Sequence, residues 1–365
     1  MTNTSIENET VKREFFAQLK GGRGFTESSV KAHADAIWKW QEFTQNDDFA
    51  NFNKIKAAEF VGWLETRPSN TPSGKLSVSS RANYVRRVKK FFEWLAGQPG
   101  YKSRILKNDV EYLRLSKAEA QTVRYGTTRK APTLDEAKQI IGKIEIKNEV
   151  DQRDRAMISL AVCTGMRIAA IVTLRMKSFD EGQKTFDQNP GDGVGTKNSK
   201  RILTTFLPID WEDPARHFLD WYGDLKGKGF GPDDPIFPAT QRGFDDQGLV
   251  GKEFWSGAGV ARNIFKERCE AANVTYYNPH SFRHLVVSVM EKRALTEEQK
   301  KAISLSLGHE DVGTTFGAHG YGKMTNDDAI KTIRQMGATL GENKGKVILS
   351  EEEMTALKGL LTKIL

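Results

Sequence analysis

The periodic pattern of apolar residues is interrupted between residues 117 and 132, and this interruption limits the folds that the chain can adopt. Before it, apolar residues recur every three or four positions, as they do in amphipathic helices. The segment itself is polar and basic, and it has no periodic apolar residue. Residues 133–136 (Thr-Leu-Asp-Glu) then form a capping box, which starts a new helix. The pattern predicts two domains joined by an extended linker, each long enough to bury its own core.

The division of the chain follows from these boundaries. We expect a disordered N-terminal tail over residues 1–8, a helical domain over 9–116, a linker over 117–132, a second domain over 133–338 and a C-terminal tail over 339–365. Within the first domain, apolar stripes through 30–40 and 84–95 predict two helices, and a third is expected over 55–64. The tail carries an amphipathic helix over 350–365.

The second domain combines helices with a small sheet. Residues 158–163 form an apolar run that ends at a Thr-Gly break. A strong turn signal over 189–193 precedes a β-rich segment over 201–207. These features predict a hairpin with Lys197 and Lys200 near its tip, and a fold that is mainly α.

Composition narrows the class of partner. The formal net charge is +8 and the pI is about 9.2, which favours a polyanion such as nucleic acid, although such a charge also serves ordinary solubility. Two cysteines, Cys163 and Cys269, cannot make a disulfide framework and fit a reducing cytosol. No apolar run approaches the length of a membrane span. We therefore expect a soluble intracellular protein.

The histidines are concentrated in one region. Of six in the chain, four lie between His280 and His319. Arg283 follows His280 by three residues, so on a helix the two side chains share a face. An imidazole beside a guanidinium suits a phosphate better than a metal. A zinc site at His280 and His284 is disfavoured because Ser281 stands where a metalloprotease has Glu and Arg283 would repel a cation; we expect no metal.

Cleavage of a phosphodiester without a metal requires groups that neutralise the charge on the phosphate. Arg167, after the Thr-Gly break, pairs naturally with Arg283 because two planar guanidinium forks match phosphate oxygens. His280 can donate to the phosphate or accept the proton of the nucleophile, and His309 follows a glycine that can present its ring. Lys197 is the preferred general acid for the leaving oxygen, with Lys200 as the reserve.

The order of these motifs resembles that of the tyrosine recombinases, the phage integrase family of DNA strand-exchange enzymes. Residues 164–167 (Thr-Gly-Met-Arg) look like the first arginine motif of the family, and Lys197 is similar to its β-hairpin lysine. Residues 279–284 (Pro-His-Ser-Phe-Arg-His) match its His-x-x-Arg box, and 307–312 (Leu-Gly-His-Glu-Asp-Val) match the next box. Residues 234–238 resemble the connector between these motifs.

The resemblance implies a helical core-binding domain and a mainly helical catalytic domain with a small β-sheet, closed around double-stranded DNA as a C-shaped clamp. It implies cleavage by a tyrosine to give a 3′-phosphotyrosyl link, a Holliday junction intermediate, and no cofactor. A homo-tetramer on two sites, an accessory DNA-bending protein, a mobile-element origin and a cytoplasmic, nucleoid-associated location are expected with it. The basic residues expected to contact DNA are Arg86, Arg87, Lys89, Lys90, Arg124, Arg129, Lys130 and Lys200.

Two positions depart from the family pattern. Ala170 stands where an acidic residue commonly follows the first arginine. Family members also place the nucleophilic tyrosine where this chain has Ala318 and His319, whereas Tyr321 is the nearby tyrosine. Three extra residues on a helix rotate a side chain by about 60°, and flanking glycines allow the segment to bend. We expect Tyr321 to be the nucleophile, with His319 in a lost nucleophile position as the rival interpretation.

Two other functions remain open on the sequence. A relative that occupies DNA without cutting it would follow if His319 occupies the nucleophile position. A type IB topoisomerase would share the chemistry but relax supercoils as a monomer. The Leu-Gly-His box and the amphipathic C-terminal segment favour the recombinase. The target sequence, and the choice among integration, excision and resolution, do not follow from the sequence.

Overall fold

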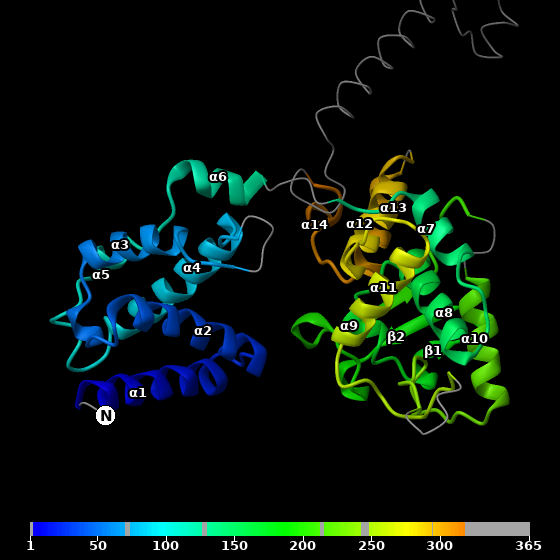
Figure 1. Ribbon diagram of the computed structural model, residues 1–365, viewed down its shortest axis with the longest axis horizontal. Coiled ribbons are helices and arrows are strands. Elements are labelled where there is room, and N and C mark those ends of the chain that lie inside the picture. The colour runs from blue at the N-terminus through cyan, green and yellow to red at the C-terminus, as the bar shows by residue number, and fades with distance from the viewer. Residues whose placement is uncertain are drawn as a thin grey trace, which may run out of the picture. The chain divides into compact units, whose positions relative to one another are not determined.

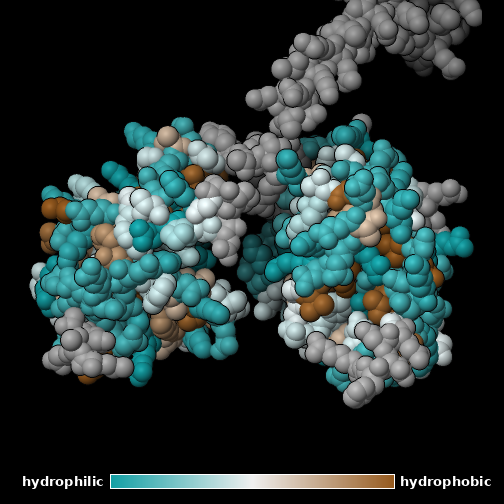
Figure 2. Space-filling view, in the orientation of Figure 1, coloured by the Kyte–Doolittle hydropathy of each residue, from teal (hydrophilic) through white to brown (hydrophobic). Residues whose placement is uncertain are grey.

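The protein is described here by a computed structural model, which covers two compact units, Met1–Thr127 and Thr128–Leu365 (Figure 1). The structure describes residues 3–69, 74–125, 130–211, 215–241, 248–293 and 295–317. Within these residues, no helix is both long and apolar enough to cross a membrane. Hydrophilic side chains cover most of the face that each unit shows in Figure 2.

The first unit is helical. Its helices are α1 (Asn3–Ala17), α2 (Glu27–Thr44), α3 (Lys54–Glu65), α4 (Val78–Leu95), α5 (Lys107–Val110) and α6 (Lys117–Tyr125), with a π-helical turn η1 (Gln18–Gly22) and a 3-10 turn η2 (Phe49–Asn51). Side-chain caps set several of the starts: Thr26, Asn53 and Ser77 each accept a hydrogen bond from a backbone N–H in the first turn of the helix that follows. The helices expected at 30–40, 55–64 and 84–95 are confirmed.

Aromatic rings fill the core of this unit. Trp40 of α2 lies with its ring centroid 4.8 Å from that of Phe92 of α4, and Phe52 stacks on Phe92 at 4.1 Å. Phe60 of α3 packs edge-on to Trp40 at 5.1 Å. These rings are all 4 % exposed or less, so α2, α3 and α4 are held by one continuous apolar cluster.

Two expectations for this unit are wrong. Residues 3–8, expected in a disordered tail, belong to α1, and Asn8 is fully buried. Its side chain donates to the carbonyl of Asp47 at 3.0 Å and accepts from the N–H of Phe49 at 3.2 Å, which fixes the helix to the loop after α2.

The segment expected as an extended linker over 117–132 is helical over α6. Ser116 and Glu119 form reciprocal cap bonds, because the Ser116 hydroxyl accepts from the Glu119 N–H at 3.2 Å and the Glu119 carboxylate accepts from the Ser116 N–H at 3.1 Å. Glu119 also pairs with Arg81 of α4 at 2.6 Å. The capping box and the ion pair therefore stabilise a helix in this polar segment. The segment has no apolar stripe, so the sequence pattern did not predict the helix.

The second unit contains helices around a small sheet. Its elements are α7 (Leu134–Gly142), α8 (Glu149–Thr164), α9 (Ile168–Ile171), η3 (Met176–Ser178), β1 (Phe179–Asp180), β2 (Thr185–Gln188), η4 (Pro190–Asp192), η5 (Lys197–Ser199), β3 (Ile202–Thr205), α10 (Arg216–Gly227), α11 (Gly259–Ala271), α12 (Pro279–Glu291), α13 (Glu297–Ser306) and α14 (Val312–Phe316). The capping box at Thr133 and Glu136 is present and starts α7. The sheet is antiparallel in the order β1-β2-β3.

The sheet and the helices share one core. α8 is buried from Ala156 to Thr164, and it packs against α10 and α12. β2 pairs with β3 so that Phe186 faces Thr204 and Gln188 faces Ile202. The connection between these strands carries Lys197 in η5, as the hairpin expected from the sequence requires. β3 also packs against α13, which brings the hairpin to the end of that helix.

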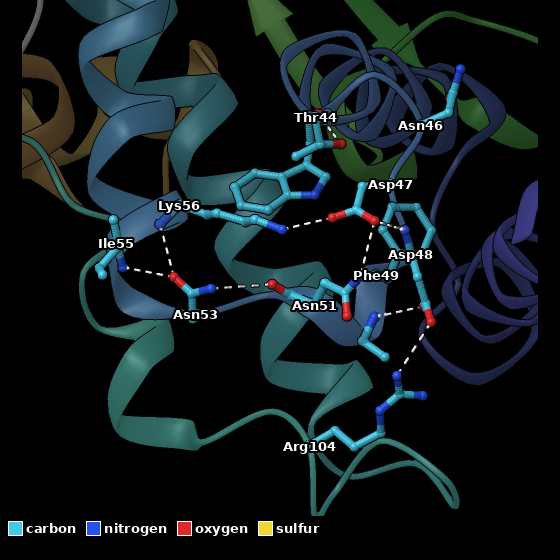
Figure 3. A network of polar contacts seen from close by, with 12 residues as sticks. Thr44, Asn46, Asp47, Asp48, Phe49, Asn51, Asn53, Ile55, Lys56 and Arg104 are labelled. Atoms are coloured by element: carbon cyan, nitrogen blue, oxygen red, sulfur yellow. Dashed lines mark hydrogen bonds and ion pairs between the residues drawn. The ribbon is translucent and has the colours of Figure 1, made fainter.

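A polar network closes the loop between α2 and α3 (Figure 3). The Asp47 carboxylate accepts from Lys56 at 2.6 Å, from the side chain of Asn51 at 2.9 Å and from the N–H of Asp48 at 2.8 Å. The bond from Lys56 is the main reason that the pKa of Asp47 lies below its usual value. The charged carboxylate therefore stabilises the loop.

Replacing Asp47 by Ala should lower the free energy of unfolding of this unit by about 1 kcal/mol, because three donors lose their acceptor. A carboxyl group with a lowered pKa in the folded state contributes above its unfolded pKa, and that contribution is lost as the pH falls through the folded pKa. Urea denaturation at neutral pH and in acid should show the difference shrinking in acid. Glu111→Ala, which breaks a pair at an exposed carboxylate, is the control and should change the stability by less than about 0.5 kcal/mol.

Candidate active site

Arg283 of α12 lies at the centre of the candidate site and is 2 % exposed. Its Nη1 donates to the carbonyl of Gly165 at 2.8 Å. Its Nη2 donates to the carbonyl of Leu307 and lies 2.8 Å from Nε2 of His309. One guanidinium therefore joins the end of α8, the helix α12 and the turn after α13.

Glycines permit this close approach. Gly165 ends α8 in the left-handed conformation, with φ +63°, and a Cβ there would lie 2.8 Å from the side chain of Leu307. Gly308 has φ +72°, and a Cβ there would lie 2.4 Å from Ile202 of β3 and 3.5 Å from Nη1 of Arg167. Both positions need glycine for the conformation and for the space. The guanidinium of Arg167, which precedes α9 as its N-cap residue, thus lies against the turn that carries His309.

His309 is held through both ring nitrogens. Nδ1 lies 2.8 Å from Oγ1 of Thr315, which also receives a hydrogen bond from Ser304 at 2.9 Å. A guanidinium can only donate, so Nε2 accepts from Arg283. The hydrogen-bond network then assigns the neutral tautomer with the proton on Nδ1, donated to Thr315.

The surroundings of His309 keep its ring neutral. Its side chain is buried, and burial is the main reason that its pKa falls to about 3. Arg283, Arg167, Lys197 and His280 lower this pKa further through their positive charge. Apart from His309 itself, the sequence predicts five catalytic residues, and the four of them that the structure describes act on the His309 ring in this way. Their charges therefore converge on one ring.

His280 lies in the first turn of α12. The Asn278 side chain caps this turn by accepting from the His280 N–H at 3.1 Å, and Pro279 occupies the first helical position. The His280 ring packs edge-on to His284 at 5.6 Å. His280 and Arg283 lie three residues apart on α12 and therefore share one face of this helix.

The two hairpin lysines differ in their partners. Lys197 is exposed on η5, and its charge reaches His309. Lys200 pairs with Glu310, the residue after His309, and this pair lowers the pKa of Glu310. Lys200 thus fastens the hairpin to the second histidine box, which favours Lys197 as the proton donor.

The predicted DNA-contacting residues occupy several places. Arg86, Arg87, Lys89 and Lys90 lie on α4, and Arg124 is exposed on α6. Lys130 is exposed before α7. Arg129, His319, Tyr321 and the C-terminal helix expected over 350–365 lie outside the described residues.

Motif matching alone does not predict the roles of Thr315 and Ser304. Both side chains are 1 % exposed or less and form the hydrogen-bond chain that fixes the His309 ring. Thr315 lies six residues after His309 on α14 and Ser304 lies five before it on α13, and no sequence pattern joins the three positions. Ala170, at the position where an acid was expected, is fully buried. Within the described residues, no cluster of three His, Cys, Asp or Glu side chains is placed to hold a metal ion.

Family models match both units of the chain. The Phage integrase family model covers residues 132–319, about half of the chain, and the model of the Phage integrase N-terminal SAM-like domain covers 13–99. The chain belongs to the phage integrase family. It is a site-specific tyrosine recombinase, as the order of its motifs predicts.

Curated relatives of this integrase-family protein span nearly its whole length. Tyrosine recombinase XerC of Herpetosiphon aurantiacus is 23 % identical over 320 residues, which cover 87 % of this chain and 92 % of the relative. Tyrosine recombinase XerD of Oceanobacillus iheyensis is 22 % identical and covers 83 % of this chain and 90 % of the relative.

Solved structures share the fold of this integrase. A lambda integrase (75-356) dimer bound to a COC' core site matches with a TM-score of 0.60, 16 % identity and coverage of 86 % of this chain and 94 % of that chain. The Tn1549 transposon integrase matches with a TM-score of 0.55, 13 % identity and coverage of 89 % and 99 %. The prediction of a mainly helical fold with a small sheet in the catalytic domain is confirmed.

The ring of His309 in this recombinase should stay neutral, with its proton on Nδ1, until the pH falls to about 3. Nitrogen-15 NMR of histidine-labelled, DNA-free protein measures both the tautomer and the titration, and His309→Gln assigns the signal. Thr315→Val removes the acceptor for Nδ1–H, so it should shift the tautomer balance. A His309 signal that titrates near the ordinary histidine pKa would contradict the buried network.

Proposed function

We propose that this recombinase breaks a DNA phosphodiester with the hydroxyl of Tyr321 and that Arg167, Arg283, His280, His309 and Lys197 activate the phosphate. The observation that carries the proposal is the convergence of four positive or basic groups on the buried ring of His309. The charges that act on this ring include those of Arg283, Arg167, Lys197 and His280, and each of them lowers the pKa of His309. A phosphate would add negative charge at the place where these positive charges meet.

The chemistry assigns a role to each group, with two alternatives for His280. Arg167 and Arg283 neutralise the charge that grows on the non-bridging oxygens as the tyrosine oxygen attacks phosphorus. The bond to the 5′ oxygen breaks, and Lys197 supplies the proton that this oxygen takes up. His280 accepts the proton of the tyrosine hydroxyl or donates to the phosphate. The product is a 3′-phosphotyrosyl link and a 5′ hydroxyl. This hydroxyl attacks the phosphorus of the phosphotyrosyl link on a partner strand, the bond from phosphorus to the tyrosine oxygen breaks, and the tyrosine takes up a proton. The reaction passes through a Holliday junction and needs no cofactor.

His309 needs the substrate to become a donor. Without DNA its Nε2 accepts from Arg283. A phosphate that draws the guanidinium toward itself would release Nε2 and add negative charge, and both changes favour protonation of the ring. His309 would then donate to a phosphate oxygen while Thr315 holds its orientation.

The other tyrosines of the second unit support Tyr321 as the nucleophile. Tyr222 donates its hydroxyl to the carbonyl of Met176 at 3.1 Å, and Tyr277 donates to the carboxylate of Glu136 at 3.1 Å. Burial raises the pKa of Tyr276, which makes its phenolate harder to form. The rival interpretation, an inactive DNA-binding relative with His319 in the nucleophile position, rests on the spacing from His309. The family match covers residue 319 and ends before Tyr321.

The partners follow from relatives that act on DNA. One solved lambda integrase is a dimer bound to a COC' core site, and another is a tetramer bound to a Holliday junction. XerH has been solved bound to difH substrate. We propose double-stranded DNA as the partner of this chain, held in a clamp by both units, and a homo-tetramer whose C-terminal helix docks on a neighbouring protomer.

The basic residues assigned to DNA are Arg86, Arg87, Lys89, Lys90, Arg124, Arg129, Lys130 and Lys200. The relative from the Tn1549 transposon supports a mobile genetic element as the source of the protein. An accessory DNA-bending protein and a nucleoid-associated location belong to the same proposal.

Incubation with a pool of nicked duplexes of randomised sequence should trap a covalent protein–DNA adduct, because the nicked fragment diffuses away and rejoining fails. Mass spectrometry of the trapped peptide should place the link on Tyr321. Tyr321→Phe should abolish the adduct, and His319→Ala should keep it. Duplex binding with no adduct from the unmodified protein would favour the inactive relative.

Lys197→Ala should slow cleavage by about 100-fold or more, since the leaving oxygen loses its acid. A substrate with sulfur in place of the 5′ bridging oxygen leaves without a proton, so it should restore the rate of Lys197→Ala to near that of the unmodified protein. Lys200→Ala is the matched control on the same hairpin and should show no such rescue. Equal, unrescued losses in both variants would assign both lysines to binding or structure.

A further inference from the structure

We infer that a cavity between α2 and α4 of the first unit is a seat for one phosphate of the DNA backbone, with His33 as its buried wall. The inference rests on the proposed DNA partner and deepens it, because it assigns one subsite of the interface to named residues. The cavity has a volume of about 300 Å³ and is lined by Phe25, Ser29, His33, Arg86, Arg87 and Lys90.

The chemistry of the wall suits an anion and little else. Three of the six lining residues are cations from one helix, one is a hydroxyl and none is a carboxylate. The Lys90 ammonium lies 4.6 Å from the centroid of the Phe25 ring, which keeps it at the cavity. Ser29 lies in the first turn of α2, where backbone dipoles also favour negative charge.

The cations of the cavity form no ion pair within 4.0 Å among the described residues, although Asp35 and Glu93 act on Arg87 and Lys90 from further away. Arg86 donates to the neutral side chain of Asn83 at 2.9 Å. Within the part of the chain that the structure describes, no ion pair is formed by Arg86, Arg87 or Lys90. Their neighbour Lys89 pairs with Glu111 at 2.7 Å and does not line this cavity. α4 therefore directs its unpaired positive charge toward one place.

His33 is the second feature that indicates a ligand. It is 5 % exposed, and its Nδ1 has no hydrogen-bond partner among the described residues. A buried imidazole nitrogen without a partner costs free energy. The ring contacts Phe15 of α1 at 5.7 Å and Phe25 at 5.9 Å between centroids, so its neighbours from those segments are uncharged.

The charges around His33 make the seat sensitive to pH. Burial, followed by Lys90, Arg87 and Arg86, lowers its pKa to about 4. Asp35 acts on Arg87, and Glu93 and Arg23 act on Lys90, at one remove from the ring. A bound phosphate would oppose the three cations and raise the pKa of His33. Binding would then take up a proton, and DNA affinity would increase as the pH falls from the pKa of the bound state toward about 4, the pKa of His33 without DNA.

The basic surface continues beyond a single anion. Arg23, Arg86, Lys89, Lys90, Glu93 and Trp94 line an adjoining hollow of about 490 Å³. A small anion would occupy only the first cavity. A polyanion bound there would also extend along the adjoining hollow. The Glu93 carboxylate in the second hollow would repel a phosphate, so we place the phosphate in the first cavity. The continuous basic surface favours a nucleic-acid backbone over a free ion.

The test uses the full-length protein and a fluorescein-labelled duplex of mixed sequence, with the dissociation constant measured by anisotropy over a range of salt concentrations. Arg87→Gln should reduce the slope of log affinity against log salt by about 0.9, the value for one lost phosphate contact. Arg86→Gln, at an exposed position, provides the same test if Arg87→Gln does not fold. Lys102→Gln removes one charge from an exposed position outside both hollows and should leave the slope unchanged.

His33 has its own readout. The affinity of the unmodified protein should rise as the pH is lowered from about 7, above the ordinary histidine pKa, toward about 4, the pKa of His33 without DNA, and His33→Gln should remove most of this rise. Thermal melting of each variant shows whether it is folded. Inorganic phosphate should compete weakly; if it shifts the His33 NMR signal at low concentration while the duplex does not, the cavity serves a small anion and the proposal is wrong.

The outcomes separate the cavity from the proposed function. The unmodified protein could bind the duplex while Arg87→Gln and Arg86→Gln show the same salt dependence of affinity as Lys102→Gln. In that case the phosphate seat is overturned and the proposed recombinase chemistry is unaffected. If the unmodified protein binds no duplex, both are overturned. Covalent adducts formed by Arg87→Gln at saturating protein, with a weaker dissociation constant, would support a seat that binds without taking part in cleavage.

Discussion

The geometry of the second unit depends on the buried guanidinium of Arg283. A guanidinium removed from water costs several kcal/mol unless its N–H groups find acceptors. Here the carbonyls of Gly165 and Leu307 supply them, and each acceptor lies at the end of a helix where backbone carbonyls lack helical partners. The end of α8 and the end of α13 are thus brought to α12 by a need for hydrogen bonds. Arg167 and His309, the residues that follow those ends, arrive at the same place as a consequence.

The residues of the site could be predicted from the sequence because its motifs mark helix ends. The Thr-Gly break before Arg167, the Asn-Pro start before His280 and the Leu-Gly turn before His309 are local signals, and local signals survive in a single sequence. Contacts between these segments are not local. The hydrogen-bond chain from Ser304 through Thr315 to His309 joins side chains of different segments, and so does the pair of Lys200 with Glu310. The residue spacing within one segment predicts neither of these contacts.

The errors in the first unit have the opposite origin. Residues 3–8 and 117–125 lack the apolar periodicity that predicts a packed helix, and they are helical nonetheless. Asn8 holds α1 through bonds to the loop after α2, and Glu119 holds α6 through a cap and an ion pair with Arg81. Polar contacts of this kind hold the helices in place of an apolar stripe. They depend on partners that are distant in the sequence: Asp47 is 39 residues from Asn8, and Glu119 is 38 residues from Arg81.

Both units contain a buried histidine whose pKa is lowered by burial and by surrounding cations, His33 in the first and His309 in the second. Repulsion among like charges reduces the stability of the DNA-free protein. A polyanion removes that repulsion, and whatever binds the folded state alone stabilises it. The same arrangement that makes each cluster unfavourable in isolation therefore makes phosphate its natural complement. If both clusters bind phosphate, as proposed, the same few side chains that lower the free energy of unfolding would contribute to the free energy of DNA binding.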